Sequence, residues 1–500
     1  MPNQRRIGVI LGYINIVTKN LVNLAYTPML LAFIGQADYG VFQSSNSFIF
    51  TLTILSFGFS GAYIRFYMQR KVQGDEKGIR SLNWLYILLY SVVCLVVLIL
   101  GLLFAANVDH VFSESFTPDE VELAGTLMTI MAFNIAIMLF STVFDAYIMA
   151  HEQFFFQQTR QLFTTLATPF LAFGLLTLGI GAVGVALAQL SVNVLLLVLN
   201  ALFAIKTLKM RFAIGLDSKL LKSIAVFSSW IFVNQVCELA NQTLPNIFLG
   251  ALSGAVAVSV FAISIQIRSV FYSLSTTMSN VFIPEVNRIV ASSNDNTVLT
   301  KLMAKVGRYQ AILYFYVLGG FVLLGQFFIS VWAGPGFADA YWLIIVMAIP
   351  LFIPLIQNTG LEIQKAKNKH KARSLVYLVM AVLNVAITVA LAPYIGYWAP
   401  AIGYITYVIV GCGIFMNWYY QTHIGLNMIF FWRRIIPVIA VAIATTALSL
   451  LGTSFLPVDS WFSFIGWGLA YSLLYGLLSI GFSLTKEERH ALLNKIHRTK

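Results

Sequence analysis

Charged and amide side chains interrupt the first long apolar stretch of this chain. Lys19 lies within "NIVTKNLVNLAYTP", thirteen residues after Arg6, and Asn15 and Asn23 lie four residues to either side of it. A spacing of four places these three side chains on one helical face. At a rise of 1.5 Å per residue, Lys19 is about 20 Å along the helix from Arg6. If this helix crosses a membrane, Lys19 lies near the middle of the bilayer. A cation at that depth indicates a site for an anion.

Two other apolar stretches repeat this pattern. Arg268 and Tyr272 share a face in residues 255–283, and Asn234, Glu238 and Asn241 share one in residues 222–249. Because lipid cannot solvate such groups, they must face protein or water. Together with Arg65 we therefore expect an electropositive, hydrated cavity. Its expected lining residues are Lys19, Arg65, Arg268, Asn15, Asn23, Asn234, Asn241 and Tyr272.

Two acidic residues are candidates for gating or ion coupling, namely Glu238 and Asp145. The alternatives are structural. Glu238 would only neutralise Lys19 or Arg268, and Asp145 would be an anchor at the membrane edge. Arg65 likewise lies near a membrane edge, where a long side chain can reach the interface without binding a substrate.

The elements that position these residues are transmembrane helices. The chain has 500 residues, of which 59% are hydrophobic and 10% charged, and its mean hydropathy is +0.83. Apolar stretches long enough to cross a hydrocarbon core recur from end to end. We predict an all-α integral membrane protein with fourteen spans. They cover residues 7–34, 41–68, 82–106, 122–150, 160–179, 182–205, 222–249, 255–283, 308–332, 340–363, 372–392, 397–420, 433–452 and 461–483.

Local signals refine some of these elements. Thr117, Pro118 and Glu120 form a capping motif for the span at 122–150. The prolines at 350 and 354 predict a bend in the span at 340–363. We also expect a short interfacial helix within residues 285–307, and a tail helix that opens with a capping box between Thr485 and Glu488.

The basic residues fix the orientation. They cluster in alternate loops, such as Lys365, Lys367, Lys369, Lys371 and Arg373, whereas "NVDHVFSESFTPDEV" and the other opposite loops contain acids and neither lysine nor arginine. The positive-inside rule then places both termini in the cytoplasm; the resemblance described below further implies the cytoplasmic membrane of a bacterial cell. The formal charge of +12 is attributed to contacts with anionic lipids rather than with nucleic acid.

No cofactor, metal or catalytic centre is expected. The six histidines are scattered, and Cys94, Cys237 and Cys412 lie singly in apolar stretches. We find no phosphate-binding Gly-rich loop and no hydrolase motif. The chain is therefore expected to move a substrate rather than to transform one.

Three segments carry a resemblance to a known family. "LAFIGQADYGVF", "SFGFSGAYIRFY" and "FAISIQIRSVFYSLSTTMSNVFIPEVNRI" resemble the polysaccharide transporter branch of the multidrug/oligosaccharidyl-lipid/polysaccharide exporter superfamily, which includes Wzx-type flippases. The resemblance implies two six-helix lobes in a V, residues 1–210 and 211–425, followed by two appended helices in 426–484 and a cytoplasmic tail in 485–500. It also implies alternating access.

The same resemblance implies a substrate and a site. The substrate would be an oligosaccharide on undecaprenyl diphosphate, flipped to the outer leaflet, with membrane lipids, a glycan polymerase and assembly proteins as partners. Lys19, Arg65 and Arg268 match basic positions in the cavity of lipid II flippases of that superfamily. The alternatives are a drug/cation antiporter, which needs buried acids, and a polysaccharide polymerase or ligase, which would be expected to have a large basic outer loop.

Overall fold

The computed structural model describes residues 2–484, except 57, 216–217, 281, 368 and 370, and also Glu488 and Arg489. All regular structure in this part of the chain is helical. Eleven of the described helical segments are long and apolar enough to cross a membrane. The first, Ile14–Val72, has 59 residues, whereas one crossing takes about 20. The chain is thus a multi-pass helical membrane protein, and the count of fourteen spans stays a prediction.

The chain forms two compact units. The N-terminal unit comprises Met1–Ala262 with Thr388–Ala399, and the C-terminal unit comprises Ile263–Ile387 with Pro400–Lys500. The predicted lobes, which divide at residues 210 and 425, stay a prediction.

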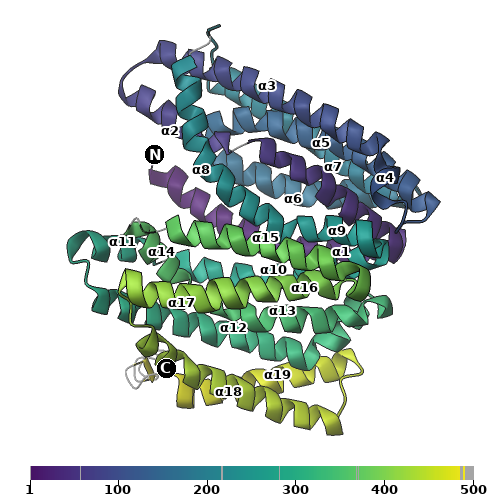
Figure 1. Ribbon diagram of the computed structural model, residues 1–500, viewed down its shortest axis with the longest axis vertical. Coiled ribbons are helices and arrows are strands. Elements are labelled where there is room, and N and C mark those ends of the chain that lie inside the picture. Colours follow the sequence, from purple (N-terminus) through teal and green to yellow (C-terminus); the bar gives the residue numbers. More distant parts are fainter. Residues whose placement is uncertain are drawn as a thin grey trace. The chain divides into compact units, whose positions relative to one another are not determined.

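The N-terminal unit is a bundle around α5, most of whose residues are buried. Helix α5 packs against α1, α2, α3 and α7, and α6 packs against α1 and α7; α3, α5 and α7 run side by side in Figure 1. The elements are α1 (Pro2–Phe50), η1 (Thr51–Ser56), α2 (Phe59–Val72), α3 (Glu76–Ala106), α4 (Val108–Phe112), α5 (Pro118–Ala150), α6 (Phe154–Thr177), α7 (Gly181–Leu202), η2 (Phe203–Thr207), α8 (Ser218–Gln242), α9 (Leu244–Ser253) and the start of α10 (Ala255–Asn280).

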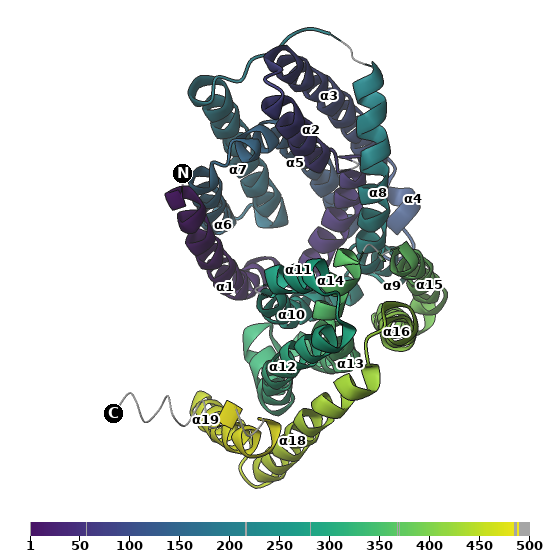
Figure 2. The same ribbon diagram turned by 90° about the vertical axis from the view of Figure 1, so that its left-hand side faces the viewer.

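The C-terminal unit is built on α12, which packs against α13, α18 and α19. Figure 2 shows α18 and α19 lying side by side next to α12. The remaining elements are α11 (Ile283–Ser292), α12 (Asn296–Trp332), η3 (Pro335–Phe337), α13 (Ala338–Ile356), α14 (Asn358–Ala366), α15 (Lys371–Ile395), α16 (Trp398–Thr406), η4 (Tyr407–Phe415), α17 (Met416–Tyr419), η5 (Tyr420–Ile424), α18 (Met428–Phe455), α19 (Trp461–Leu478) and η6 (Ser479–Ser483).

Two glycines with the same backbone conformation turn the chain in the N-terminal unit. Gly35 interrupts α1 at φ 77° and ψ 178°, and Gly254 separates α9 from α10 at φ 85° and ψ 172°. Side chains other than hydrogen disfavour this region. Beyond Gly35, the chain packs so closely on the start of α10 that a Cβ at Gly40 would lie 1.9 Å from the carbonyl oxygen of Ala255.

Several local predictions are confirmed. Thr117 and Glu120 form a capping box, with Pro118 in the first turn of α5. The helix expected within 285–307 is α11, which begins at Ile283. The span with two prolines is interrupted at Gln357, between α13 and α14. Thr485, the proposed cap of the tail helix, lies outside the described residues.

The span expected at 222–249 differs from the prediction. Helix α8 ends at Gln242, and α9 begins at Leu244 with Pro245 in its first turn. Proline has no amide hydrogen and its ring clashes with the preceding turn, so the helix is broken here rather than continued.

A buried ion pair ties the end of the chain to α12. The Arg308 guanidinium binds the Glu488 carboxylate, and their side chains are only 8% and 19% exposed. The Tyr309 hydroxyl donates to the same carboxylate at 2.6 Å. A buried arginine without a counter-charge raises the free energy of the folded state. Glu488 removes this cost and therefore stabilises the fold by more than a single hydrogen bond would.

We predict that Glu488→Gln lowers the free energy of unfolding of the detergent-purified protein by about 1–3 kcal/mol, since Arg308 loses its counter-charge while Tyr309 keeps an acceptor. The control is Lys365→Gln, which breaks the ion pair between Lys365 and Glu362. The Lys365 side chain is 53% exposed, so this substitution should change the free energy of unfolding by less than about 1 kcal/mol. Thermal unfolding of both variants measures the difference. Equal losses of stability in the two variants would show that the buried pair stabilises the protein no more than the exposed pair does.

Candidate functional site

The polar face of α1 is divided between packing and exposure. Asn15 is 7% exposed, and its Nδ2 donates to the backbone oxygen and to Oε1 of Gln158 on α6, at 2.8 and 2.7 Å. Lys19 and Asn23, one and two turns further on, are exposed. Asn15 thus fixes α1 on α6. Lys19 lies one turn further along the same face, where the face is exposed.

Asp145 is held in an ion pair near the end of α5. Its Oδ1 lies 2.7 Å from Arg160 Nη1 of α6, and the two side chains are 33% and 16% exposed. Gln157 Nε2 donates to the same oxygen at 3.4 Å. The carboxylate therefore has a counter-charge within hydrogen-bonding distance, as expected if Asp145 has a structural role rather than a role in ion coupling.

The arginine extends this contact into a network across three helices. Arg160 Nη1 donates to Asn200 Oδ1 of α7 at 2.6 Å, and Asn200 Nδ2 donates to Ser141 Oγ of α5 at 2.9 Å. Sequence reasoning missed Arg160, because it lies at the start of an expected span, where a cation is ordinary. Its signal would have been the single positive charge of its span, close in sequence to Asp145 at the end of the preceding span.

At the C-cap of α5, His151 links α5 to α2. Its Nδ1 lies 2.9 Å from the Tyr147 carbonyl oxygen, to which it must donate, so Nε2 accepts from the Tyr67 hydroxyl at 3.0 Å. Burial lowers the pKa of His151; the hydrogen bond to Tyr147 opposes this and the charge of Lys71 adds to it. The imidazole is accordingly neutral near pH 7 and serves as a structural contact.

Arg268 is buried in the C-terminal unit. It is 4% exposed, and its guanidinium lies 4.0 Å from the ring centroid of Tyr404 on α16. Its Nη1 lies 3.7 Å from Met347 Sδ on α13. A desolvated cation–π contact of this kind contributes about 2 kcal/mol. Arg268 is therefore covered on these sides, unlike Lys19.

Tyrosines continue from this contact along the unit. The Tyr404 and Tyr407 rings lie 6.3 Å apart, and the Tyr407 and Tyr377 rings 5.5 Å apart. Arg373 lies 4.6 Å from the Tyr377 ring at the start of α15. We call Arg268, Tyr404, Tyr407, Tyr377 and Arg373 the arginine–tyrosine row. The sequence could not indicate it, because it joins three segments with no common spacing.

The remaining predicted site residues differ in exposure. Tyr272 is 55% exposed. Arg65 is exposed, with its guanidinium 6.0 Å from the Phe66 ring. Asn241 is half-buried. The side chains of Asn234 and Glu238 lie outside the described residues.

The chain matches a family of polysaccharide biosynthesis proteins. The family model described as "Polysaccharide biosynthesis protein" covers residues 30–342. The uncharacterized membrane protein EpsK of Bacillus subtilis (strain 168) is 26% identical over 284 residues, which are 56% of this chain and 55% of that protein. The matched region thus spans about half the length of this relative.

Two solved structures show the same fold. The lipid II flippase MurJ, in an inward closed conformation, superposes with a TM-score of 0.77 at 15% identity, over 94% of this chain and 98% of that one. An inward-facing multidrug resistance MATE family transporter of the MOP superfamily superposes with a TM-score of 0.63 at 16% identity, over 81% and 98%. At such identities the likeness establishes the fold alone.

We predict that Asp145→Asn destabilises the protein by about 1–3 kcal/mol, because Arg160 is left as a half-buried charge without its counter-ion. The loss is smaller than for a fully buried pair, because water screens the partly exposed site. The exchange Asp145→Arg with Arg160→Asp should recover at least half of the loss. Thermal unfolding of the two variants and of wild type gives the comparison. A stable Asp145→Asn protein with impaired export would instead assign Asp145 to ion coupling.

Proposed function

Because the chain belongs to the polysaccharide biosynthesis protein family, we propose that it is a flippase for undecaprenyl-diphosphate-linked oligosaccharide. The substrate is a repeat unit of O-antigen, capsule or exopolysaccharide, and it moves from the inner to the outer leaflet of the bacterial cytoplasmic membrane by alternating access. The chain binds the lipid-linked oligosaccharide without modifying it. A glycan polymerase and other assembly proteins would receive the product.

One observation carries this proposal, namely the exposed Lys19 on an apolar helix. A charged side chain at mid-membrane depth costs about 2.5–3.5 kcal/mol even on the lenient insertion scale. Asn15 beside it is committed to Gln158, whereas Lys19 is exposed. A diphosphate carries the negative charge and the acceptor oxygens that the Lys19 ammonium would bind.

Arg268 is proposed to exchange one partner for another during transport. In the described conformation its guanidinium stacks on the ring of Tyr404, which holds the cation in place. An incoming diphosphate offers a stronger, charge-assisted interaction. The ring of Tyr404 would then hold Arg268 ready between transport cycles.

The driving force is proposed to include the membrane potential. A potential negative inside favours outward movement of an anion by about 2.3 kcal/mol per charge per 100 mV. Of the two coupling candidates, Asp145 has Arg160 as its counter-ion, which favours a structural role. Glu238 remains the candidate carrier of a coupling ion.

A drug/cation antiporter is the second candidate, because the MATE family transporter shares the fold. Such a protein needs acids that hold a cation, whereas Lys19, an exposed residue on α1, is itself a cation. Efflux of a cationic dye from cells expressing the chain, compared with their surface glycan, separates the two functions. Dye efflux without glycan export would replace the flippase proposal.

We predict that Arg268→Ala abolishes export while membrane insertion is unchanged, because the substrate anion loses its buried cation. Tyr404→Phe should export normally, since the ring is retained, and Tyr404→Leu should export several-fold less. The matched control is Arg288→Ala, an exposed arginine on α11. Surface glycan per inserted protein is the measurement, and normal glycan in Arg268→Ala would remove this residue from the site.

We predict that Lys19→Gln lowers export at least tenfold, which corresponds to about 1.4 kcal/mol of lost binding to the anion. Lys19→Arg should retain most of the activity, because the charge is preserved. Both variants are compared with wild type by the rate of labelled lipid-linked oligosaccharide transfer in vesicles. Equal rates in Lys19→Gln and wild type would contradict a role in binding.

A further inference from the structure

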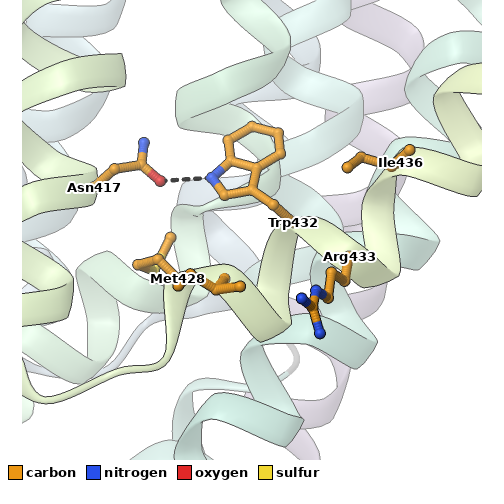
Figure 3. Close-up of a pocket in the computed structure, with 6 residues that line it drawn as sticks. Asn417, Met428, Trp432, Arg433 and Ile436 are labelled. Atoms are coloured by element: carbon orange, nitrogen blue, oxygen red, sulfur yellow. Dashed lines mark hydrogen bonds between the residues drawn. The ribbon is translucent and has the colours of Figure 1, made fainter.

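A cavity of about 350 Å³ lies in the C-terminal unit between α17 and the beginning of α18, and it opens at the surface. Figure 3 shows Trp432 in the centre of this group, between Asn417 and Ile436. The lining residues are Asn417, Met428, Ile429, Trp432, Arg433 and Ile436. Ile429, Arg433 and Ile436 follow one another at helical spacing and so share one face of α18.

The polar groups of Asn417 are already engaged. Its Oδ1 accepts from Trp432 Nε1 at 2.7 Å and from Gln357 Nε2 at 3.2 Å, and its Nδ2 donates to the Gly413 carbonyl oxygen at 2.5 Å. Trp432 consequently presents only the hydrocarbon part of its indole to the cavity. Its one N–H is used internally, as buried indoles require.

Arg433 is the one charged residue of the lining. Within the described part of the chain, its guanidinium makes no ion pair or hydrogen bond, and it is exposed. Its neighbour Arg434 points elsewhere and lies 5.3 Å from the Phe430 ring. The cavity therefore offers one available cation beside an apolar surface.

These features select the chemistry of a ligand. A sugar or nucleotide would bring hydroxyl and amide groups against Met428, Ile429 and Ile436, where they would lose their hydrogen bonds to water. A molecule with one anionic group and a hydrocarbon chain fits both parts. Ile429 and Ile436 are 65% and 56% exposed, so the apolar part is open to the lipid phase.

We propose that this cavity binds one anionic glycerophospholipid. Its phosphate contacts Arg433, and one acyl chain lies along Ile429, Ile436 and the ring of Trp432. With the orientation given by the positive-inside rule, the lipid belongs to the cytoplasmic leaflet, whose anionic head groups favour a basic residue at this level. This site is independent of the flippase proposal, since it involves neither Lys19 nor Arg268.

The test is native mass spectrometry of the full-length protein in detergent, titrated with phosphatidylglycerol or with phosphatidylcholine of the same acyl chains. Wild type is expected to bind one phosphatidylglycerol at least fivefold more tightly than phosphatidylcholine. Arg433→Gln should lose this preference, Arg433→Lys should keep most of it, and Arg434→Gln should keep all of it. Ile436→Asn should weaken both lipids, because the acyl chain then meets a polar group.

Three outcomes would overturn the proposal. The first is equal affinity for the two lipids in wild type. The second is an equal loss in Arg433→Gln and Arg434→Gln, which would indicate a diffuse basic surface. The third is undecaprenyl phosphate binding more than tenfold tighter than phosphatidylglycerol in an Arg433-dependent manner, which would assign the cavity to the carrier lipid. None of these measurements requires transport, so a failure here leaves the flippase proposal standing.

Discussion

The need to satisfy polar side chains in apolar surroundings governs this structure. Where lipid replaces water, an arginine or carboxylate is retained only with a partner or with access to solvent. Arg160 meets Asp145 and Asn200 in the N-terminal unit, and Arg308 meets Glu488 in the C-terminal unit. Lys19 is exposed instead. This contrast separates charged groups that hold the bundle together from a charged group that the packing of the helices leaves exposed.

The helical class and many helix boundaries could be predicted from the sequence, because they depend on local chemistry. The capping box at Thr117 needs only residues three apart, and the interruption at Gln357 follows two prolines that weaken the preceding turn. The break between α8 and α9 was missed. Hydropathy is continuous across Gln242 and Leu244, so an apolar stretch was read as a single helix although Pro245 removes a backbone donor.

The site was predicted less completely, because depth along a helix does not specify its neighbours. Helical spacing located Asn15, Lys19 and Asn23 on one face, yet the commitment of Asn15 to Gln158 arises from the packing of α6 on α1. In the same way, an arginine at mid-span suggested exposure to a cavity, whereas Arg268 stacks on Tyr404 from a segment more than a hundred residues later. Such contacts are set by the tertiary fold.

The wide helical turns of η4 have a consequence for how this region can change. Tyr407–Phe415 is π-helical, so each turn holds more than the usual 3.6 residues. The wide turns accommodate a surplus residue, so a one-residue deletion there would close the segment into an ordinary α-helix and leave Asn417 facing Trp432. The same deletion in a regular α-helical turn would rotate the residues after it by about 100°. Segment η4 thus tolerates a change in length that an ordinary helix does not.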